Sequence, residues 1–140
     1  MMFLLDTNVL SAMMRPEPDP AVNHWISGKI AADMFTAAVC EAEILAGLAV
    51  MPLGRRRADY ENAARAIFRQ DFGGRVLPFD TDAAANYADI HAVRRRAGRP
   101  VATIDLMIAA IARTRGAVVV TRNVSDFDLC GLRLINPWTQ

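Results

Sequence analysis

Short apolar runs alternate with longer stretches of helical periodicity along the chain. The apolar runs predict strands at 2–5, 33–37, 75–79, 117–121 and 132–135. The stretches between them predict helices at about 7–14, 20–28, 39–50, 55–72, 82–97 and 103–115. Such β-α alternation favours a mostly parallel sheet with helices on both faces. We therefore expect an α/β fold in which residues 1–140 form a single three-layer α/β/α domain.

Turn and capping residues mark the limits of these elements. The proline-rich segment 15–20 predicts a turn, and Met-Pro-Leu-Gly at 51–54 ends the preceding helix. Asp80 is placed to cap the helix that follows it, and Thr103 the helix after that, which stops at Gly116. No linker, internal repeat or low-complexity segment divides the chain.

The composition is that of a globular protein, since 53% of the residues are hydrophobic. No window reaches the roughly 18 uninterrupted apolar residues of a membrane span. The first residues lack the basic region of a signal peptide, because Asp6 interrupts the apolar run early. Cys40 and Cys130 have neither metal-ligand spacing nor the density of a disulfide scaffold. We expect a cytoplasmic protein with reduced cysteines and no membrane partner.

The segment FLLDTNVL at 3–10 is the first indication of chemistry. Its apolar residues predict a buried strand that ends at Asp6, followed by Thr7 and Asn8. In α/β sheets, ligands bind beyond the carboxyl ends of the strands. Asp6 is therefore placed for catalysis or binding, with two small polar residues able to orient it. The alternative is that Asp6 only caps the helix at 7–14.

Three more carboxylates lie in largely apolar surroundings. Glu43 and Asp105 interrupt apolar helical stretches, and Asp126 follows the β-branched run VVV. A buried carboxylate is costly unless it is paired with a cation or bound to a metal. No lysine lies near Asp105 in the sequence. Convergence of the four acids on a divalent cation would account for all of them.

The charge balance fits this interpretation. The net charge is +1, from 16 basic and 15 acidic residues. If four acids form one pocket, 11 acidic residues remain against 16 basic ones, a charge of +5. Every basic residue except Lys29 is arginine, which suits phosphate because its planar fork donates two parallel hydrogen bonds. An arginine bias from a GC-rich genome is the alternative explanation.

Taken together, these segments resemble the PIN-domain ribonucleases, in particular VapC-type toxins of the FitB-like branch. Any one of the matching segments is weak evidence, but they occur in the family's order over nearly the whole chain. They are LLDTNVLS at 4–11, RPEPDPAV at 15–22, AEILAGL at 42–48, GRVLPFD at 74–80, ID with IAAIA at 104–112, VTRN at 120–123 and INPW at 135–138.

The resemblance implies that Asp6, Glu43 and Asp105 bind Mg²⁺ or Mn²⁺, with Asp6 and Asp105 as direct ligands. A fourth acidic position varies in the family. Some members have an acid directly after Thr-Arg, where this chain has Asn123; others have it three residues later, at Asp126. Asp126 is our candidate for the fourth catalytic and metal-binding residue. Asp128 is a further candidate on the same turn.

Other polar residues surround the predicted site. We expect Thr7 and Asn8 to orient Asp6 or water on the metal, and Arg122 and Asn123 to support the site from the end of the VVV strand. The arginine runs at 55–57 and 94–96 are either RNA contacts or solvated helix ends. Trp138 is expected to pack near the C-terminus or to form part of an interface.

The resemblance also implies activity and partners. It implies water attack on an RNA phosphodiester, leaving 5′-phosphate and 3′-hydroxyl ends, and a cognate antitoxin with a DNA-binding domain. We further expect a homodimer. The helices at 7–14 and 39–50 offer an apolar groove for a partner, although core packing is the commoner use of such residues. Two alternatives remain: a non-catalytic PIN-like module that binds a DNA-binding regulatory partner, and a DNA-directed nuclease.

Overall fold

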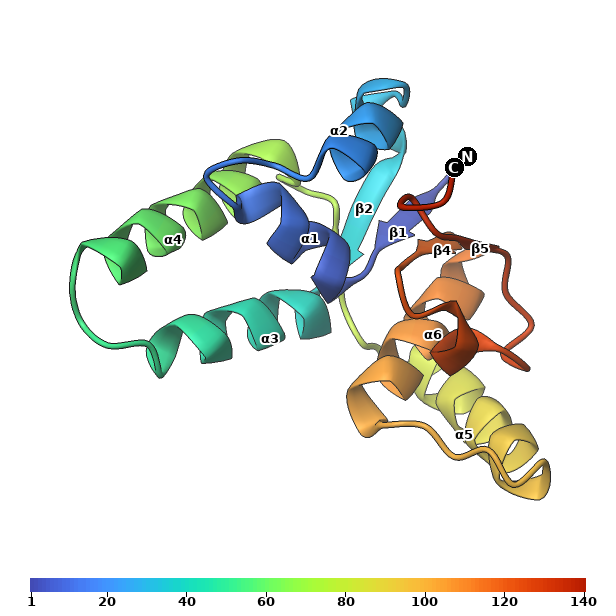
Figure 1. Ribbon diagram of the computed structural model, residues 1–140. Helices are drawn as coiled ribbons and strands as arrows, with labels where there is room; N and C mark the ends of the chain where they lie inside the picture. Colours follow the sequence, from blue (N-terminus) through green and yellow to red (C-terminus); the bar gives the residue numbers. More distant parts are fainter.

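The computed structural model describes residues 1–140 and contains five strands in one sheet (Figure 1). The strands are β1 (Phe3–Leu5), β2 (Met34–Ala37), β3 (Val76–Leu77), β4 (Val118–Val120) and β5 (Leu134–Ile135). Their order is β3-β2-β1-β4-β5, and every neighbouring pair is parallel. Phe3 of β1 is paired with both Met34 and Val118, so the first strand is the centre of the sheet. The parallel sheet is as predicted.

Six α-helices flank this sheet. They are α1 (Thr7–Met14), α2 (Pro20–Ser27), α3 (Ala38–Ala49), α4 (Arg55–Ala66), α5 (Thr81–Arg96) and α6 (Thr103–Arg115). Figure 1 shows α1, α3 and α4 grouped on one side of the sheet and α5 beside α6 on the other. This arrangement confirms the predicted three-layer α/β/α fold. None of the helices is long and apolar enough to cross a membrane.

Buried apolar side chains explain why these elements pack as they do. The Val118–Val120 strand is buried throughout, as expected for β-branched residues inside a parallel sheet. The run Ile108–Ala112 of α6 is also fully buried, and its alanines permit close approach to neighbouring elements. Asn86 of α5 donates a hydrogen bond to the Thr114 hydroxyl of α6 at 2.8 Å. Cys40 and Cys130 are free thiols, and both are buried.

Helix limits agree with the sequence prediction in most places. Asp80 caps α5 by accepting a hydrogen bond from the backbone N–H of Ala83 at 2.9 Å. Gly116 ends α6 in the left-handed conformation, at φ 65°, which favours glycine. The capping role predicted for Thr103 is wrong. Thr103 is the first helical residue, and Ala102, with extended backbone and no side-chain cap, precedes it.

Two predicted features differ more substantially. The helix expected over 55–72 is α-helical only to Ala66 and continues as a π-helical turn, η2 (Ile67–Asp71). The arginine run 94–96 was expected to be solvated or to face RNA, but Arg94 is only 4% exposed. It donates hydrogen bonds to backbone carbonyls at the end of α5 and around the 3₁₀ turn η3 (Val124–Phe127), so it is a structural residue.

Candidate active site

Four chain segments meet at the carboxyl edge of the central strands. Asp6 follows β1 directly, and Arg122 lies two residues beyond β4. Glu43 is in the second turn of α3, which begins directly after β2, and Asp105 is in the first turn of α6. Because β1 lies between β2 and β4 in the sheet, residues far apart in sequence become neighbours here. We call this region the acidic pocket.

The acidic pocket has a volume of about 470 Å³ and a largely polar lining. Three of the four predicted acids line it, together with all four residues predicted to support the site. The lining residues are Asp6, Thr7, Asn8, Ser11, Arg15, Glu43, Asp105, Arg122, Asn123 and Trp138. Asp126, in η3, does not line the pocket, but its charge acts on both Asp6 and Asp105.

Asp6 is the most buried acid and is fixed by three hydrogen bonds. The residue as a whole is only 3% exposed. Oδ1 accepts from the backbone N–H of Thr7 at 2.7 Å, and Oδ2 accepts from the Thr121 hydroxyl at 2.7 Å and the Asn8 amide at 3.2 Å. Asp6 is also the N-cap residue of α1, so it caps this helix and lines the pocket at the same time.

Asn8 and Thr121 join the end of β1 to the end of β4. The Asn8 carboxamide oxygen accepts a hydrogen bond from the backbone N–H of Arg122 at 3.1 Å. The Thr121 hydroxyl accepts from the backbone N–H of Asn123 at 3.0 Å. Both side chains therefore hold Asp6 and the β4 loop in one network. Thr121 is not among the residues predicted for the site, although a threonine directly after VVV is a polar residue at the end of a buried strand.

Glu43 lies on the exposed side of the acidic pocket. Its Oε1 accepts a hydrogen bond from the Thr7 hydroxyl at 2.6 Å. Thr7 therefore contacts two acids, Asp6 through its backbone and Glu43 through its side chain. The orienting role predicted for Thr7 agrees with this geometry.

Burial and mutual repulsion disfavour the charged forms of the two most enclosed acids. Burial raises the pKa of Asp105 to about 6, and the negative charges of Asp6, Asp126 and Glu43 add to the effect. Burial also raises the pKa of Asp6, although the hydrogen bonds from Thr121 and Thr7 oppose it. Clustered carboxylates with raised pKa values in a pocket are typical of functional sites.

The acidic pocket fits a divalent cation by charge and by donor chemistry, because Mg²⁺ and Mn²⁺ prefer carboxylate oxygens and water. As the side chains stand, no three carboxylate, histidine or cysteine groups are arranged to coordinate one ion. Like charges repel, and Thr7 holds Glu43 in place. Ligation of one ion by all three carboxylates would therefore require these side chains to rearrange.

The chain is similar to known proteins over nearly its whole length. Residues 3–128 match the model of the PIN domain family. The chain is 42% identical over 137 residues to the VapC ribonuclease Y4jK of Sinorhizobium fredii, covering 98% of both chains. It is 34% identical over 137 residues to toxin FitB of Neisseria gonorrhoeae, covering 98% of this chain and 99% of FitB.

The fold is also similar to solved structures. A chain in the structure of FitAB bound to an IR36 DNA fragment superimposes with a TM-score of 0.90 at 36% identity, covering 98% of this chain and 96% of that one.

Proposed function

The chain belongs to the PIN-domain family, and on that premise we propose that it is a metal-dependent endoribonuclease, the toxin of a toxin–antitoxin pair. Its relatives include a VapC ribonuclease and the toxin FitB, which supports a nuclease role. The observation that carries the metal-dependent mechanism is the acidic pocket itself. Asp6, Glu43 and Asp105 come from three different segments and line one cavity, in which Arg15 and Arg122 are the basic residues.

Asp6 and Asp105 would hold Mg²⁺ or Mn²⁺ directly, and Glu43 and Asp126 would act through water or hold a second ion. The bound cation would supply an activated water and stabilise negative charge on the phosphoryl oxygens. Thr121, Asn8 and the Thr7 backbone fix the Asp6 carboxylate through three hydrogen bonds. Partners that orient a ligand in this way commonly change metal affinity or activity about 10–100-fold when removed.

The surface next to the acidic pocket has the apolar character that suits an antitoxin segment. A groove of about 360 Å³ runs between α1, α3 and α4, and its lining includes Met14, Ile44, Leu48 and Met51. The same groove reaches Thr7 and Glu43 and is therefore continuous with the acidic pocket. The relatives solved in complexes include FitAB on DNA. We propose that an antitoxin segment occupies the groove and places a basic side chain among the acids; the expected homodimer stays a prediction.

The central test is cleavage of total bacterial tRNA by the purified protein. We expect cleavage to stop with EDTA and to return with Mg²⁺ or Mn²⁺. Asp105→Ala should reduce the rate at least about 100-fold, because charge stabilisation by a metal is worth several kcal/mol. Asp89→Ala is the matched control, since Asp89 is an exposed carboxylate on α5 outside the acidic pocket.

The same assay separates the alternatives. Full cleavage by Asp105→Ala, after purification that excludes cellular nucleases, would contradict the site assignment. Cation-independent binding without cleavage would favour a non-catalytic binding module. Cleavage of structured DNA in preference to RNA would favour the DNA-directed nuclease.

The fourth position is tested by comparing Asp126→Asn with Asn123→Ala. Asp126 acts on Asp6 and Asp105 through its charge, from outside the pocket lining. We therefore expect Asp126→Asn to reduce cleavage about tenfold, less than Asp105→Ala. If Asp126→Asn were neutral and Asn123→Ala severe, the fourth position would belong to Asn123.

A further inference from the structure

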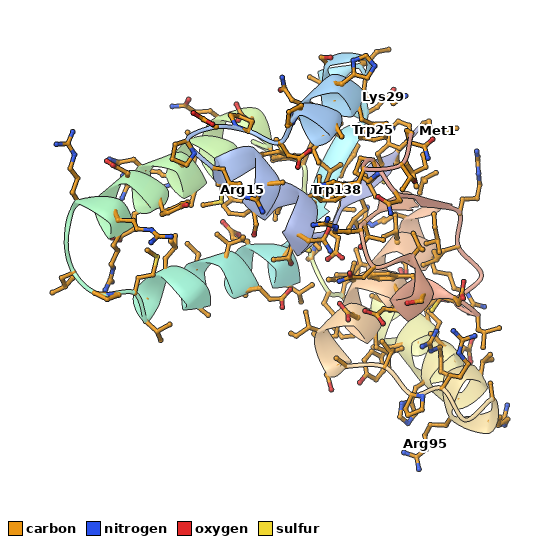
Figure 2. The ribbon with its side chains drawn as sticks, viewed as in Figure 1. Met1, Arg15, Trp25, Lys29, Arg95 and Trp138 are labelled. Atoms are coloured by element: carbon orange, nitrogen blue, oxygen red, sulfur yellow. The ribbon has the colours of Figure 1, made fainter.

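Trp138 lines the acidic pocket, a position that the metal-dependent mechanism does not use. Trp138 is held in place by two hydrogen bonds, one from its indole and one from its backbone. Nε1 donates to Asp19 Oδ2 at 3.2 Å, and the backbone N–H of Trp138 donates to Asn136 Oδ1 at 2.9 Å. Asp19 is itself fixed, because its other oxygen caps α2. Figure 2 shows Trp138 beside the N-terminal half of the chain, close to α1. These contacts therefore hold Trp138 at the edge of the acidic pocket.

The ring of Trp138 packs against the guanidinium of Arg122. The guanidinium carbon of Arg122 lies 4.9 Å from the centroid of the ring, within the range of a cation–π contact. The backbone of Arg122 is anchored as well, since its N–H donates to Asn8 Oδ1 at 3.1 Å. Arg122 is thus held from both ends: by the same Asn8 that binds Asp6, and by Trp138.

The guanidinium of Arg122 forms no salt bridge. The salt bridges of the molecule involve other residues, although Arg122 shares a pocket with three acids. Arg122 is exposed, so its donors are free to bind an anion. A guanidinium fork matches the two non-bridging oxygens of a phosphodiester.

We propose that Arg122 binds a phosphate of the RNA strand next to the cleaved bond and that Trp138 is the positioning residue that holds it there. This inference rests on the proposed ribonuclease function. The acids would bind the cation that faces the reacting phosphate, and Arg122 would fix the strand at the edge of the same pocket. The free guanidinium fork matches the two non-bridging oxygens of a phosphodiester, so the observations favour RNA as the ligand of Arg122.

The test compares Arg122→Gln with Arg95→Gln, using total bacterial tRNA as substrate. Arg95 is an exposed arginine at the far end of α5 from Trp138 (Figure 2). For Arg122→Gln we expect KM to rise about tenfold or more, because a hydrogen bond between charged groups is lost. The salt dependence of kcat/KM should also become shallower by about 0.7 in log–log slope, the value for one phosphate contact on a single strand. Arg95→Gln should leave both unchanged.

Substitutions of Trp138 test the positioning role separately. Trp138→Leu removes the ring and should raise KM severalfold with kcat little changed. Trp138→Phe keeps an aromatic face and should recover part of the loss. Adding tRNA in EDTA should change the tryptophan fluorescence of the wild type but not of Trp138→Phe, a readout that needs no cleavage. If Trp138→Leu fails to fold, Arg122→Gln still decides the question, because its side chain is exposed.

The outcomes separate this inference from the function on which it rests. If the wild type cleaves tRNA and Arg122→Gln matches Arg95→Gln in KM and salt slope, the inference is wrong and the ribonuclease proposal stands. If Arg122→Gln weakens only antitoxin binding, Arg122 serves the protein partner and the inference is also wrong. If the wild type neither binds nor cleaves RNA, the ribonuclease proposal fails first.

Discussion

Asp6 and Arg94 are the two buried charged residues of the molecule, 3% and 4% exposed. Neither forms a salt bridge. Asp6 accepts hydrogen bonds from one backbone N–H and two side chains at the end of β1. Arg94 donates to the backbone carbonyls of Arg99, Ser125 and Asp128. Each buried charge is therefore satisfied by neutral groups.

The surroundings of the two charges differ in sign. Arg94 lies against carbonyl oxygens, whose partial negative charge stabilises a guanidinium. Asp6 lies among further carboxylates, and the charges of Glu43 and Asp126 raise its pKa beyond the effect of burial. A buried charge with complementary neighbours stabilises the fold, whereas one among like charges costs free energy until a counter-ion binds. This difference makes Arg94 a structural charge and supports the role in cation binding that we propose for Asp6.

The two regions are nevertheless connected. Arg94 links the end of α5 to η3, the turn that contains Asp126. Next to it, Arg99 forms an exposed salt bridge with Asp128 at 3.4 Å. The buried arginine thus holds the turn that brings a fourth negative charge towards the acidic pocket.

Replacing the buried Arg94 should have the largest effect on the stability of the protein. Arg94→Met leaves three carbonyls without their donor, and we expect the free energy of unfolding to fall by about 2–4 kcal/mol. Urea denaturation followed by circular dichroism measures the change. Arg95→Met is the matched control, because Arg95 is the exposed neighbour on the same helix turn, and it should change stability by less than about 0.5 kcal/mol. Equal stability of the two variants would show that the carbonyl contacts of Arg94 contribute nothing.

Neutralising Asp6 should weaken metal binding and have little effect on the stability of the metal-free protein. Asp6→Asn keeps the shape of the side chain and relieves repulsion, so the stability of the metal-free protein should change by no more than about 1 kcal/mol. With Mn²⁺ at 100 times its Kd, the wild type should gain about 2.7 kcal/mol, a rise in Tm on the order of 10 °C. Thermal melts should show this rise in the wild type and not in Asp6→Asn. The same rise in both proteins would place the ion elsewhere.

The fold and part of the site were predictable from local patterns. The strand that ends at Asp6 was visible in FLLDTN, and the limits of α1 and α5 followed from their caps. Asp6, Glu43 and Asp105 stood out because each interrupts apolar residues, and the structure brings them into one pocket. These inferences needed only neighbouring residues in the sequence.

The rest depended on contacts between distant segments. Thr121 becomes a partner of Asp6 only because β4 lies next to β1, a pairing across more than a hundred residues. Trp138 reaches the pocket because Asp19 holds it. The sequence could not predict the burial of Arg94, because an arginine run at a helix end is usually solvated or available to RNA. Hydrogen bonds to the carbonyls around η3 hold this side chain in the interior. The role of Asp126 as the fourth ligand remains a prediction.

The smallest expected effect is a pH dependence in the acidic pocket. Burial first, and then the charges of Asp6, Asp126 and Glu43, raise the pKa of Asp105 to about 6. Between about pH 4 and pH 6, the folded protein therefore binds a proton that the unfolded chain has already lost. In EDTA, the stability of the metal-free protein should fall as pH rises through this window and level off above it.

The slope of stability against pH should be shallower in Asp105→Asn and unchanged in the exposed control Asp89→Asn. Saturating Mn²⁺ should reverse the trend in the wild type, because ligation requires the deprotonated carboxylate. Identical slopes in the wild type and Asp105→Asn would show that repulsion at Asp105 is relieved in the folded protein without a cation, and would remove the main electrostatic contrast between Arg94 and the acidic pocket.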